Sequence, residues 1–106
     1  MSGQFDFVSV FKKPTIHHLG CCISRRIQLR DGTQKTLGVF LPTEHPIIFV
    51  TSVAERVEII SGQCWVQIGE EEDYRRYMPG QSFYVSKHTE FKILCHEVVD
   101  YVCHFE

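Results

Sequence analysis

Turn signals recur along this chain at intervals of about ten residues, and the segments between them alternate apolar and polar side chains. Asp31-Gly32, Ser61-Gly62 and Pro79-Gly80 are typical of tight turns between antiparallel strands. No window repeats apolar residues at the helical spacing of three and four over a helical length. The pattern therefore predicts an all-β sandwich or barrel and excludes a helical bundle.

The alternation predicts strands over 23–30, 37–41, 47–51, 55–60, 64–68, 82–85, 91–95 and 99–105. A chain of 106 residues forms one domain that buries roughly two-thirds of its unfolded surface. We expect residues 14–106 to form the barrel and residues 1–13 to form an N-terminal arm or edge strand. That arm carries Phe5, Phe7 and Phe11, so it is expected to cover a sheet edge or to pack on a second subunit, which favours a homodimer.

Charge and composition exclude several classes of protein. A net charge of −2 lacks the basic excess of a nucleic-acid-binding groove. No apolar run approaches the ~20 residues of a membrane span, and the first residues do not read as a secretory signal, so a cytoplasmic protein is expected. The five cysteines are then expected to be reduced thiols. No Cys-x-x-Cys or His-x-x-x-His spacing is present, which argues against a zinc site.

Two charged residues fall on otherwise apolar strand faces. Arg25 shares a face with Ile23 and Ile27, so it is either part of an anion site in the barrel mouth or a strand-end arginine whose head reaches water. Glu55 is inward if Val57 and Ile59 face the core. It would then hold sugar hydroxyls or accept a proton; the alternative is a partly wet carboxylate at a strand entrance.

Three further side chains are candidates for substrate contacts. His88 lies in a Ser-Lys-His-Thr-Glu segment expected to be a loop, where it either contacts substrate or is merely solvated. Tyr84 and Tyr101 point inward if Ser82 and Val99 do. Their rings would stack on a base or simply pack in the core.

Two stretches carry a resemblance to a known family. The first is Asp-Gly-Thr-Gln-Lys-Thr-Leu-Gly-Val-Phe-Leu-Pro at 31–42. The second runs from Glu-Arg-Val-Glu-Ile-Ile-Ser-Gly at 55–62 through Tyr-Met-Pro-Gly-Gln-Ser-Phe-Tyr-Val at 77–85 to Tyr-Val-Cys at 101–103. Together they resemble the pyrimidine/purine nucleoside phosphorylase family. The resemblance implies a single-domain cupin-type β-barrel, or jelly roll, and the conversion of nucleoside plus phosphate into free base plus pentose 1-phosphate.

The same resemblance implies that no metal cofactor is used. Metal-binding cupins place two histidines and a glutamate before the first conserved glycine and a third histidine after the Pro-Gly strand. Glu55 falls at the glutamate position, but residues 49–52 contain no histidine and Phe91 occupies the later position. One ligand of four does not hold a transition metal tightly. The chain departs from the family at Ser86-Lys87, where Pro-Gly or Pro-Ala is usual.

The reaction that the resemblance implies needs a phosphate site, a grip on the ribose and a base site, and we assign these roles to specific residues as a hypothesis. We expect Arg25 to bind phosphate with Ser24 or Lys35, and Glu55 to hold the ribose and stabilise its developing positive charge. Tyr84 and Tyr101 form the base platform, while Phe40 and His88 complete the substrate-binding set. The alternatives are a non-catalytic cupin that binds a small polar ligand or a protein partner, and a zinc or iron cupin with unusual ligands.

Overall fold

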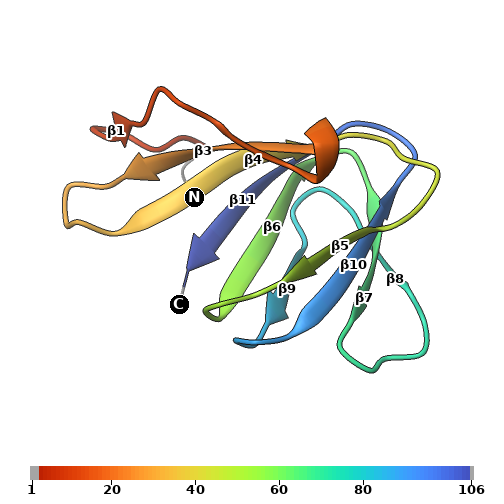
Figure 1. Cartoon of the computed structure of the whole chain (residues 1–106). Helices are drawn as coiled ribbons and strands as arrows, with labels where there is room; N and C mark the ends of the chain where they lie inside the picture. Colours follow the sequence, from red (N-terminus) through yellow and green to blue (C-terminus); the bar gives the residue numbers. More distant parts are fainter. Residues whose placement is uncertain (1–2, 106) are drawn as a thin grey trace.

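The computed structural model describes residues 3–105 as two antiparallel β-sheets that enclose an apolar core (Figure 1). The larger sheet has seven strands in the order β1-β3-β4-β11-β6-β9, and β2 also pairs with β3. Its strands are β1 (Ser9–Val10), β2 (Thr15–His17), β3 (Cys22–Gln28), β4 (Gln34–Phe40), β6 (Glu55–Ser61), β9 (Ser82–Val85) and β11 (Val99–Phe105).

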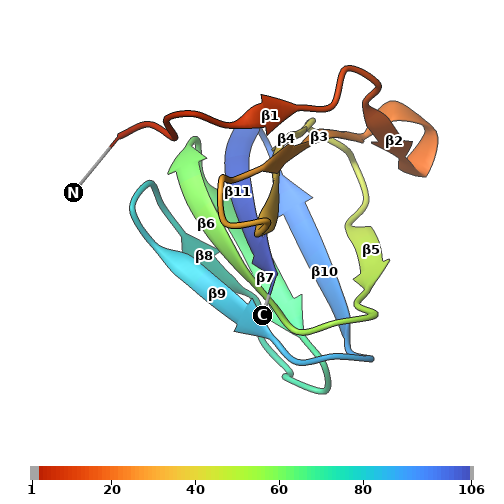
Figure 2. The same ribbon diagram turned by 90° about the vertical axis from the view of Figure 1, so that its left-hand side faces the viewer.

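The smaller sheet has four strands in the order β5-β10-β7-β8. These are β5 (Ile47–Val50), β7 (Cys64–Ile68), β8 (Arg75–Tyr77) and β10 (Glu90–Cys95). A single 3-10 turn, η1 (His18–Gly20), joins β2 to β3. Figure 2 shows the larger sheet on one side and β5 and β10 on the other, with β1 along the outer edge. No helix within residues 3–105 is long and apolar enough to cross a membrane.

The β3–β4 hairpin shows how the sequence dictates the local fold. The Asp31 side chain accepts a hydrogen bond from the Thr33 N–H at 2.9 Å, and the Leu29 N–H donates to the Thr33 carbonyl at 2.8 Å. Gly32 takes a left-handed φ of 90°, which glycine adopts without steric cost. The hairpin turn predicted at Asp31-Gly32 is confirmed.

Both sheets contribute fully buried side chains to one core. Ile59 comes from the larger sheet, and Ile93, Cys64 and Cys95 come from the smaller one. Because side chains alternate along a strand, the rest of each strand points away from the core. The residues that pair directly with Ile59 on the neighbouring strands therefore also have their side chains on the inner face of the larger sheet.

The predicted all-β fold is confirmed, but the prediction of a closed barrel is wrong in this structure. Each sheet keeps two free edges, because no ladder of hydrogen bonds joins β5 or β8 to the larger sheet. The edges of the larger sheet are β9 on one side and β1 with β2 on the other, and those of the smaller sheet are β5 and β8. The short strands β2 and β8 were not expected, since neither Thr15–His17 nor Arg75–Tyr77 alternates clearly. The expected arm (1–13) and barrel (14–106) both include positions outside the described residues, namely 1, 2 and 106.

Candidate functional site

A cavity of about 210 Å³ lies between the two sheets, and we call it the inner pocket. Strands β3, β4, β6 and β11 supply one wall, and β5 and β10 supply the other. The residues that line it are His17, Ser24, Thr36, Phe40, Phe49, Val50, Thr51, Ser52, Glu55, Val57, Phe91, Tyr101, Cys103 and Phe105.

The register of the strands explains why these residues meet. On β11, Tyr101 pairs with Gly38 of β4 on one side and with Ile59 of β6 on the other. Two residues further along β11, Cys103 pairs with Thr36 and Val57 in the same way. Residues that pair directly across antiparallel strands point to the same face of the sheet. Since Ile59 is fully buried, this face is the inner one.

Glu55 is the carboxylate of the inner pocket. It opens β6, pairs with Val85 on β9, and is half-buried. Burial raises the pKa of Glu55 above its usual value, because the charged form loses hydration. A hydrogen bond with the Cys103 thiol partly offsets that rise in pKa. The Cys103 pKa is raised to about 12, chiefly by burial and then by the nearby Glu55, so this thiol remains protonated and donates to the carboxylate.

Stacked aromatic rings form the floor of the inner pocket. The rings of Phe40 and Tyr101 are nearly parallel, at 12°, with their centroids 4.1 Å apart. Phe49 meets Phe40 edge-on at 5.8 Å and stacks on Phe91 at 5.2 Å. Two stacked pairs joined edge-to-face make a rigid apolar surface, on which a further planar ring can stack.

The Tyr101 hydroxyl is held at the back of this floor. It lies 3.2 Å from the Cys22 sulfur, within hydrogen-bond distance. Burial, followed by the neighbouring Cys22, raises the pKa of Tyr101 well above its usual value. The hydroxyl therefore keeps its proton and acts as a neutral hydrogen-bonding group rather than as a phenolate.

Several hydroxyl groups also line the pocket wall. Thr51 is buried, and its hydroxyl donates to the Ser86 carbonyl at 2.6 Å and accepts from the Thr89 N–H at 3.0 Å. Thr51 thus fixes the loop after β9 against the end of β5. Ser24 and Thr36, from β3 and β4, place two more hydroxyls on the same face as Glu55.

Beside these hydroxyls, His17 at the end of β2 is the one imidazole among the described lining residues. Burial, and secondarily the adjacent His18, lowers its pKa, so the ring is held neutral. The inner pocket thus offers one carboxylate, several hydroxyls, a neutral imidazole and an aromatic floor, which are the groups that bind a polyhydroxylated sugar carrying a planar ring.

The family model for pyrimidine/purine nucleoside phosphorylase matches residues 12–105 of this chain. The chain belongs to the pyrimidine/purine nucleoside phosphorylase family. Relatives of that name from Acinetobacter baumannii and Acinetobacter baylyi are each 53% identical over 105 residues, covering 99% of this chain and 97% of theirs. A relative from Cupriavidus taiwanensis is 45% identical over 104 residues, covering 98% of this chain and 97% of its own.

Solved structures agree with the fold of this family member. A protein of unknown function from Acinetobacter sp. ADP1 superposes with a TM-score of 0.97 at 53% identity, covering 99% of this chain and all of that one. Hydroxypropylphosphonic acid epoxidase from S. wedmorenis reaches a TM-score of 0.68 at 10% identity, over 90% of this chain and 56% of that one. At that identity the likeness shows the fold alone.

In this member of the nucleoside phosphorylase family, Arg25 and Glu55 do not share a cavity, so that part of the sequence prediction is wrong. Arg25 pairs with Leu37, which in turn pairs with Val102, on the outer face of the larger sheet, and Arg25 is exposed. Its Nε donates to the Lys12 carbonyl at 3.4 Å. Arg25 does share a face with Ile23 and Ile27, as the alternation indicates, but that face points away from the core.

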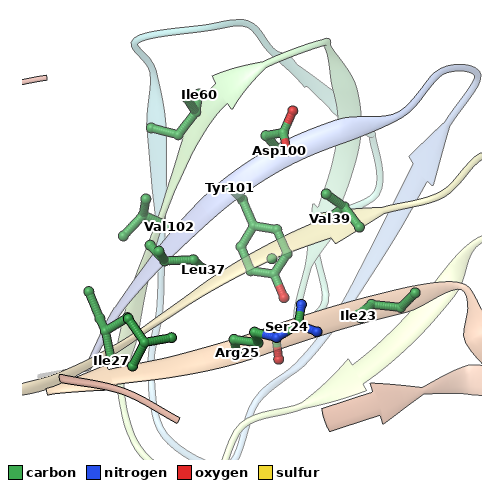
Figure 3. A pocket seen from close by; sticks show the side chains of 12 residues that line it. Ile23, Ser24, Arg25, Ile27, Leu37, Val39, Ile60, Asp100, Tyr101 and Val102 are labelled. Carbon is green, nitrogen blue, oxygen red and sulfur yellow. The ribbon is translucent and has the colours of Figure 1, made fainter. Parts of the chain in front are cut away.

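The apolar neighbours of Arg25 line a second cavity of about 460 Å³, which we call the outer groove (Figure 3). Its lining residues are Val10, Ile23, Ser24, Arg25, Ile27, Leu37, Gly38, Val39, Ile60, Asp100, Tyr101 and Val102. Both faces of the larger sheet are therefore apolar here, which is why alternation alone assigned the inner face wrongly for β3.

Three other predicted site residues also lie outside the inner pocket. Lys35 is on the outer face, where its Nζ lies 2.8 Å from Nδ1 of His104. Tyr84 pairs with Arg56 and is 54% exposed, so its predicted inward orientation is wrong. The side chains of β9 that face the core are those of Phe83 and Val85, on the opposite face of the strand from Tyr84. His88 is exposed in the loop after β9, with a left-handed φ of 54°.

Four predicted residues do meet in the inner pocket: Ser24, Phe40, Glu55 and Tyr101. Sequence reasoning missed Thr36, Phe49 and Thr51, and it had no means of finding them, because their roles depend on register and on the opposing sheet. Within residues 3–105 no group of three or more His, Cys, Asp or Glu side chains is arranged to hold a metal ion.

Proposed function

We propose that this chain catalyses the phosphorolysis of nucleosides in the inner pocket. The observation that carries the proposal is the half-buried Glu55 carboxylate beside the stacked Phe40 and Tyr101 rings. Membership of the nucleoside phosphorylase family supports the reaction class. The reaction transfers a pentosyl group from the base to phosphate, and is therefore a glycosyltransferase reaction.

The proposed step is balanced without any further reactant. An oxygen of HPO₄²⁻ forms a bond to the anomeric carbon while the bond from that carbon to the base nitrogen breaks. The bonding electron pair leaves with the base, and the proton of the phosphate ends on it. The products are pentose 1-phosphate and the neutral base.

Glu55 is proposed to act on the sugar. Its carboxylate would accept hydrogen bonds from the ribose hydroxyls and stabilise the positive charge that develops at the anomeric carbon. A charge that is partly shielded from water is worth more to such a transition state than one in bulk solvent. The Cys103 thiol holds the carboxylate in place by its hydrogen bond.

The aromatic floor is proposed to bind the base by stacking. Every base offers a π-face, so a stacking surface tolerates purines and pyrimidines alike. Strong discrimination would need buried polar groups that read base edges. The described floor consists of Phe40, Phe49, Phe91 and the Tyr101 ring, of which only Tyr101 has a hydroxyl, and that hydroxyl is directed to Cys22. Broad base specificity follows.

The volume of the inner pocket limits how a nucleoside would sit. At about 210 Å³ it is smaller than the ~300 Å³ at which sites for drug-sized ligands begin. A nucleoside and a phosphate ion do not both fit inside it. Either the phosphate ion or one end of the nucleoside would therefore lie at the mouth of the pocket.

The experiment is a panel of nucleosides, including uridine and inosine, incubated with and without inorganic phosphate. We expect free base and pentose 1-phosphate only when phosphate is present. Glu55→Gln should lower kcat/KM by about 100-fold or more, the range for losing a charged group that acts in the transition state. Glu58→Gln is the matched control, because Glu58 lies on the same strand but on the outer face, paired with Val102.

Two results would count against this function. One is base release that does not depend on phosphate. The other is no base release from any nucleoside while a nucleoside still raises the melting temperature, which would favour a non-catalytic cupin that binds a small polar ligand.

The remaining expectations about the molecule stay proposals. They are a jelly roll of cupin type over 14–106, an N-terminal arm or edge strand over 1–13, a cytoplasmic role in nucleotide salvage without nucleic-acid binding, and a homodimer. The apolar outer groove, with Leu37 38% and Ile60 48% exposed, supports pairing of two copies. Sedimentation equilibrium should give twice 12.4 kDa, and Ile60→Asp should shift it towards the monomer.

A further inference from the structure

The inner pocket contains a carboxylate but lacks a strong cation. Among its described lining residues there is no Lys and no Arg, and the His17 imidazole is held neutral. Phosphate is a dianion whose binding sites in proteins are usually built on Arg or Lys. If phosphorolysis occurs here, the cation must come from the rim of the pocket.

Arg26 is the arginine on the correct face of the sheet. It pairs with Thr36 on β4, and Thr36 pairs with Cys103 on β11. Both Thr36 and Cys103 line the inner pocket, so Arg26 continues their row outward to the rim. Its side chain is exposed, which leaves the guanidinium able to turn towards an anion beside the Thr36 hydroxyl.

The two other basic candidates are directed elsewhere. Arg25, the preceding residue, projects from the opposite face and donates to the Lys12 carbonyl. Lys35 also lies on the outer face, where it contacts His104. Of these three basic residues, Arg26 is therefore the one that β3 and β4 place on the inner face of the sheet, in register with Thr36 and Cys103.

The N-terminal segment holds Arg26 in this position. The Phe11 N–H donates to the Arg26 carbonyl at 3.0 Å, and the guanidinium carbon lies 5.7 Å from the centroid of the Phe11 ring. A cation–π contact at an exposed site is weaker than a charge-assisted hydrogen bond. It restricts the side chain without preventing it from binding an anion.

We propose that Arg26 binds the phosphate co-substrate at the rim of the inner pocket, together with the Thr36 hydroxyl, and that Phe11 positions it. This inference rests on the proposed function, because it assigns the anion end of the same reaction. Phosphate bound there would face the anomeric carbon of a sugar held by Glu55. Arg26 is in this scheme a substrate-binding residue, and Phe11 is a positioning residue.

The test compares two adjacent arginines on opposite faces of one strand. Arg26→Ala should raise the KM for phosphate by about 10- to 100-fold, the loss expected for one or two charge-assisted hydrogen bonds, and leave the nucleoside KM nearly unchanged. Arg25→Ala should keep the phosphate KM within about twofold of wild type, as is usual for an exposed side chain remote from the site. Arg26→Lys, which keeps the charge but not the fork of donors, should fall between them.

A binding measurement separates this inference from the activity itself. Calorimetric titration of inorganic phosphate into the wild-type protein should give a Kd that Arg26→Ala weakens as much as it raises KM. Phe11→Leu should weaken phosphate binding by a few-fold in the same direction and leave the kcat at saturating phosphate unchanged, since Leu keeps bulk but has no π-face.

Each outcome is decisive. An unchanged phosphate Kd in Arg26→Ala, or an equal loss in Arg25→Ala, overturns the assignment. If the wild type releases no base but Arg26→Ala abolishes phosphate binding, the proposed function fails while Arg26 remains the anion site. If Arg26→Ala does not fold, Arg26→Gln keeps most of the side-chain volume and tests the same loss of charge.

Discussion

The ring of Tyr101 lies directly on the backbone of Gly38: a Cβ placed at position 38 would stand 2.6 Å from both the Tyr101 hydroxyl oxygen and its Cζ. Glycine in a strand is ordinarily unfavourable, because it lacks a side chain to pack and costs more conformational entropy. Here its absence of a side chain is what allows Tyr101 to reach Cys22 and to stack on Phe40. The glycine of β4 and the aromatic floor of the inner pocket are one structural unit.

Gly38→Ala should therefore damage both stability and activity. The added methyl overlaps the Tyr101 ring, which must move away from Phe40 or force β4 and β11 apart. We expect a loss of about 1–3 kcal/mol in the free energy of unfolding, the usual cost of overpacking. Urea titration followed by circular dichroism measures it. Gly3→Ala is the control, since nothing lies within 4 Å of a Cβ there, and it should unfold as the wild type does.

Tyr101 variants separate stacking from hydrogen bonding. Tyr101→Phe keeps the ring on Phe40 and removes the hydroxyl next to Cys22, so we expect a loss of about 0.5–1.5 kcal/mol in stability and little change in base preference. Tyr101→Leu removes the ring as well and should raise the KM for both uridine and inosine. If Tyr101→Phe alone abolished turnover of one base class, the floor would be reading base edges rather than stacking.

Sequence alone was sufficient for the all-β class and for the inward orientation of Glu55 on β6 and Tyr101 on β11. Glu55 and Tyr101 were placed correctly because Val57, Ile59 and Val99 mark the buried phase of their strands without ambiguity. The turn at Asp31-Gly32 was equally local, since it needs only a glycine and an Asp side chain.

The other half of the site depends on information that is not local. Strand β3 carries Ile23 and Ile27 on one face and Cys22 and Ser24 on the other, and both faces are covered to some degree. The apolar pattern then selects the outer groove as readily as the core, so the sequence pointed to Arg25, on the face of Ile23 and Ile27, as the inward charge. Only the pairing of β3 with β4, which is fixed by the whole sheet, shows which of the two arginines lies on the inner face.

The raised pKa of Glu55 predicts a specific pH dependence of stability. Its pKa is higher in the folded than in the unfolded protein, so the folded state binds the proton more tightly. The folded state therefore loses stability as pH rises from the usual glutamate pKa through the raised pKa of Glu55. Glu55→Gln removes the cost of burying the charge. The variant should melt above the wild type near pH 7, and the difference in melting temperature should shrink as pH falls towards 4.5, the usual pKa of a glutamate side chain.

Calorimetric melting temperatures between pH 4 and pH 8 measure that difference. Glu58→Gln, which alters the outer face of the same strand, should not show the same pH dependence of the melting-temperature difference. A Glu55→Gln protein that is less stable than wild type at pH 7 and unchanged relative to it at acid pH would contradict the burial of this charge.

On the outer face, His104 bridges two charged side chains. The Lys35 Nζ lies 2.8 Å from Nδ1, and the Glu58 Oε1 lies 2.9 Å from Nε2. An ammonium group can only donate, so Nδ1 is the acceptor and Nε2 carries the proton that is donated to Glu58. Burial lowers the pKa of His104, and Lys35 and Arg56 lower it further, while Glu58 opposes them. The neutral ring is the form that fits this arrangement.

Because the pKa of His104 in the folded state is lower than the usual histidine value of 6.5, the unfolded chain takes up a proton first as pH falls. Stability contributed by this histidine is complete above 6.5 and is lost progressively below it, as protonation sets a second positive charge against Lys35. His104→Gln should lower the melting temperature at pH 7.5 and make the melting temperature fall less steeply between pH 6.5 and pH 5.

His45→Gln, at an exposed site, is the control and should leave the decline in melting temperature as steep as in the wild type. An undiminished slope in His104→Gln would assign the acid sensitivity to other groups, His17 first among them, because its pKa is also lowered by burial.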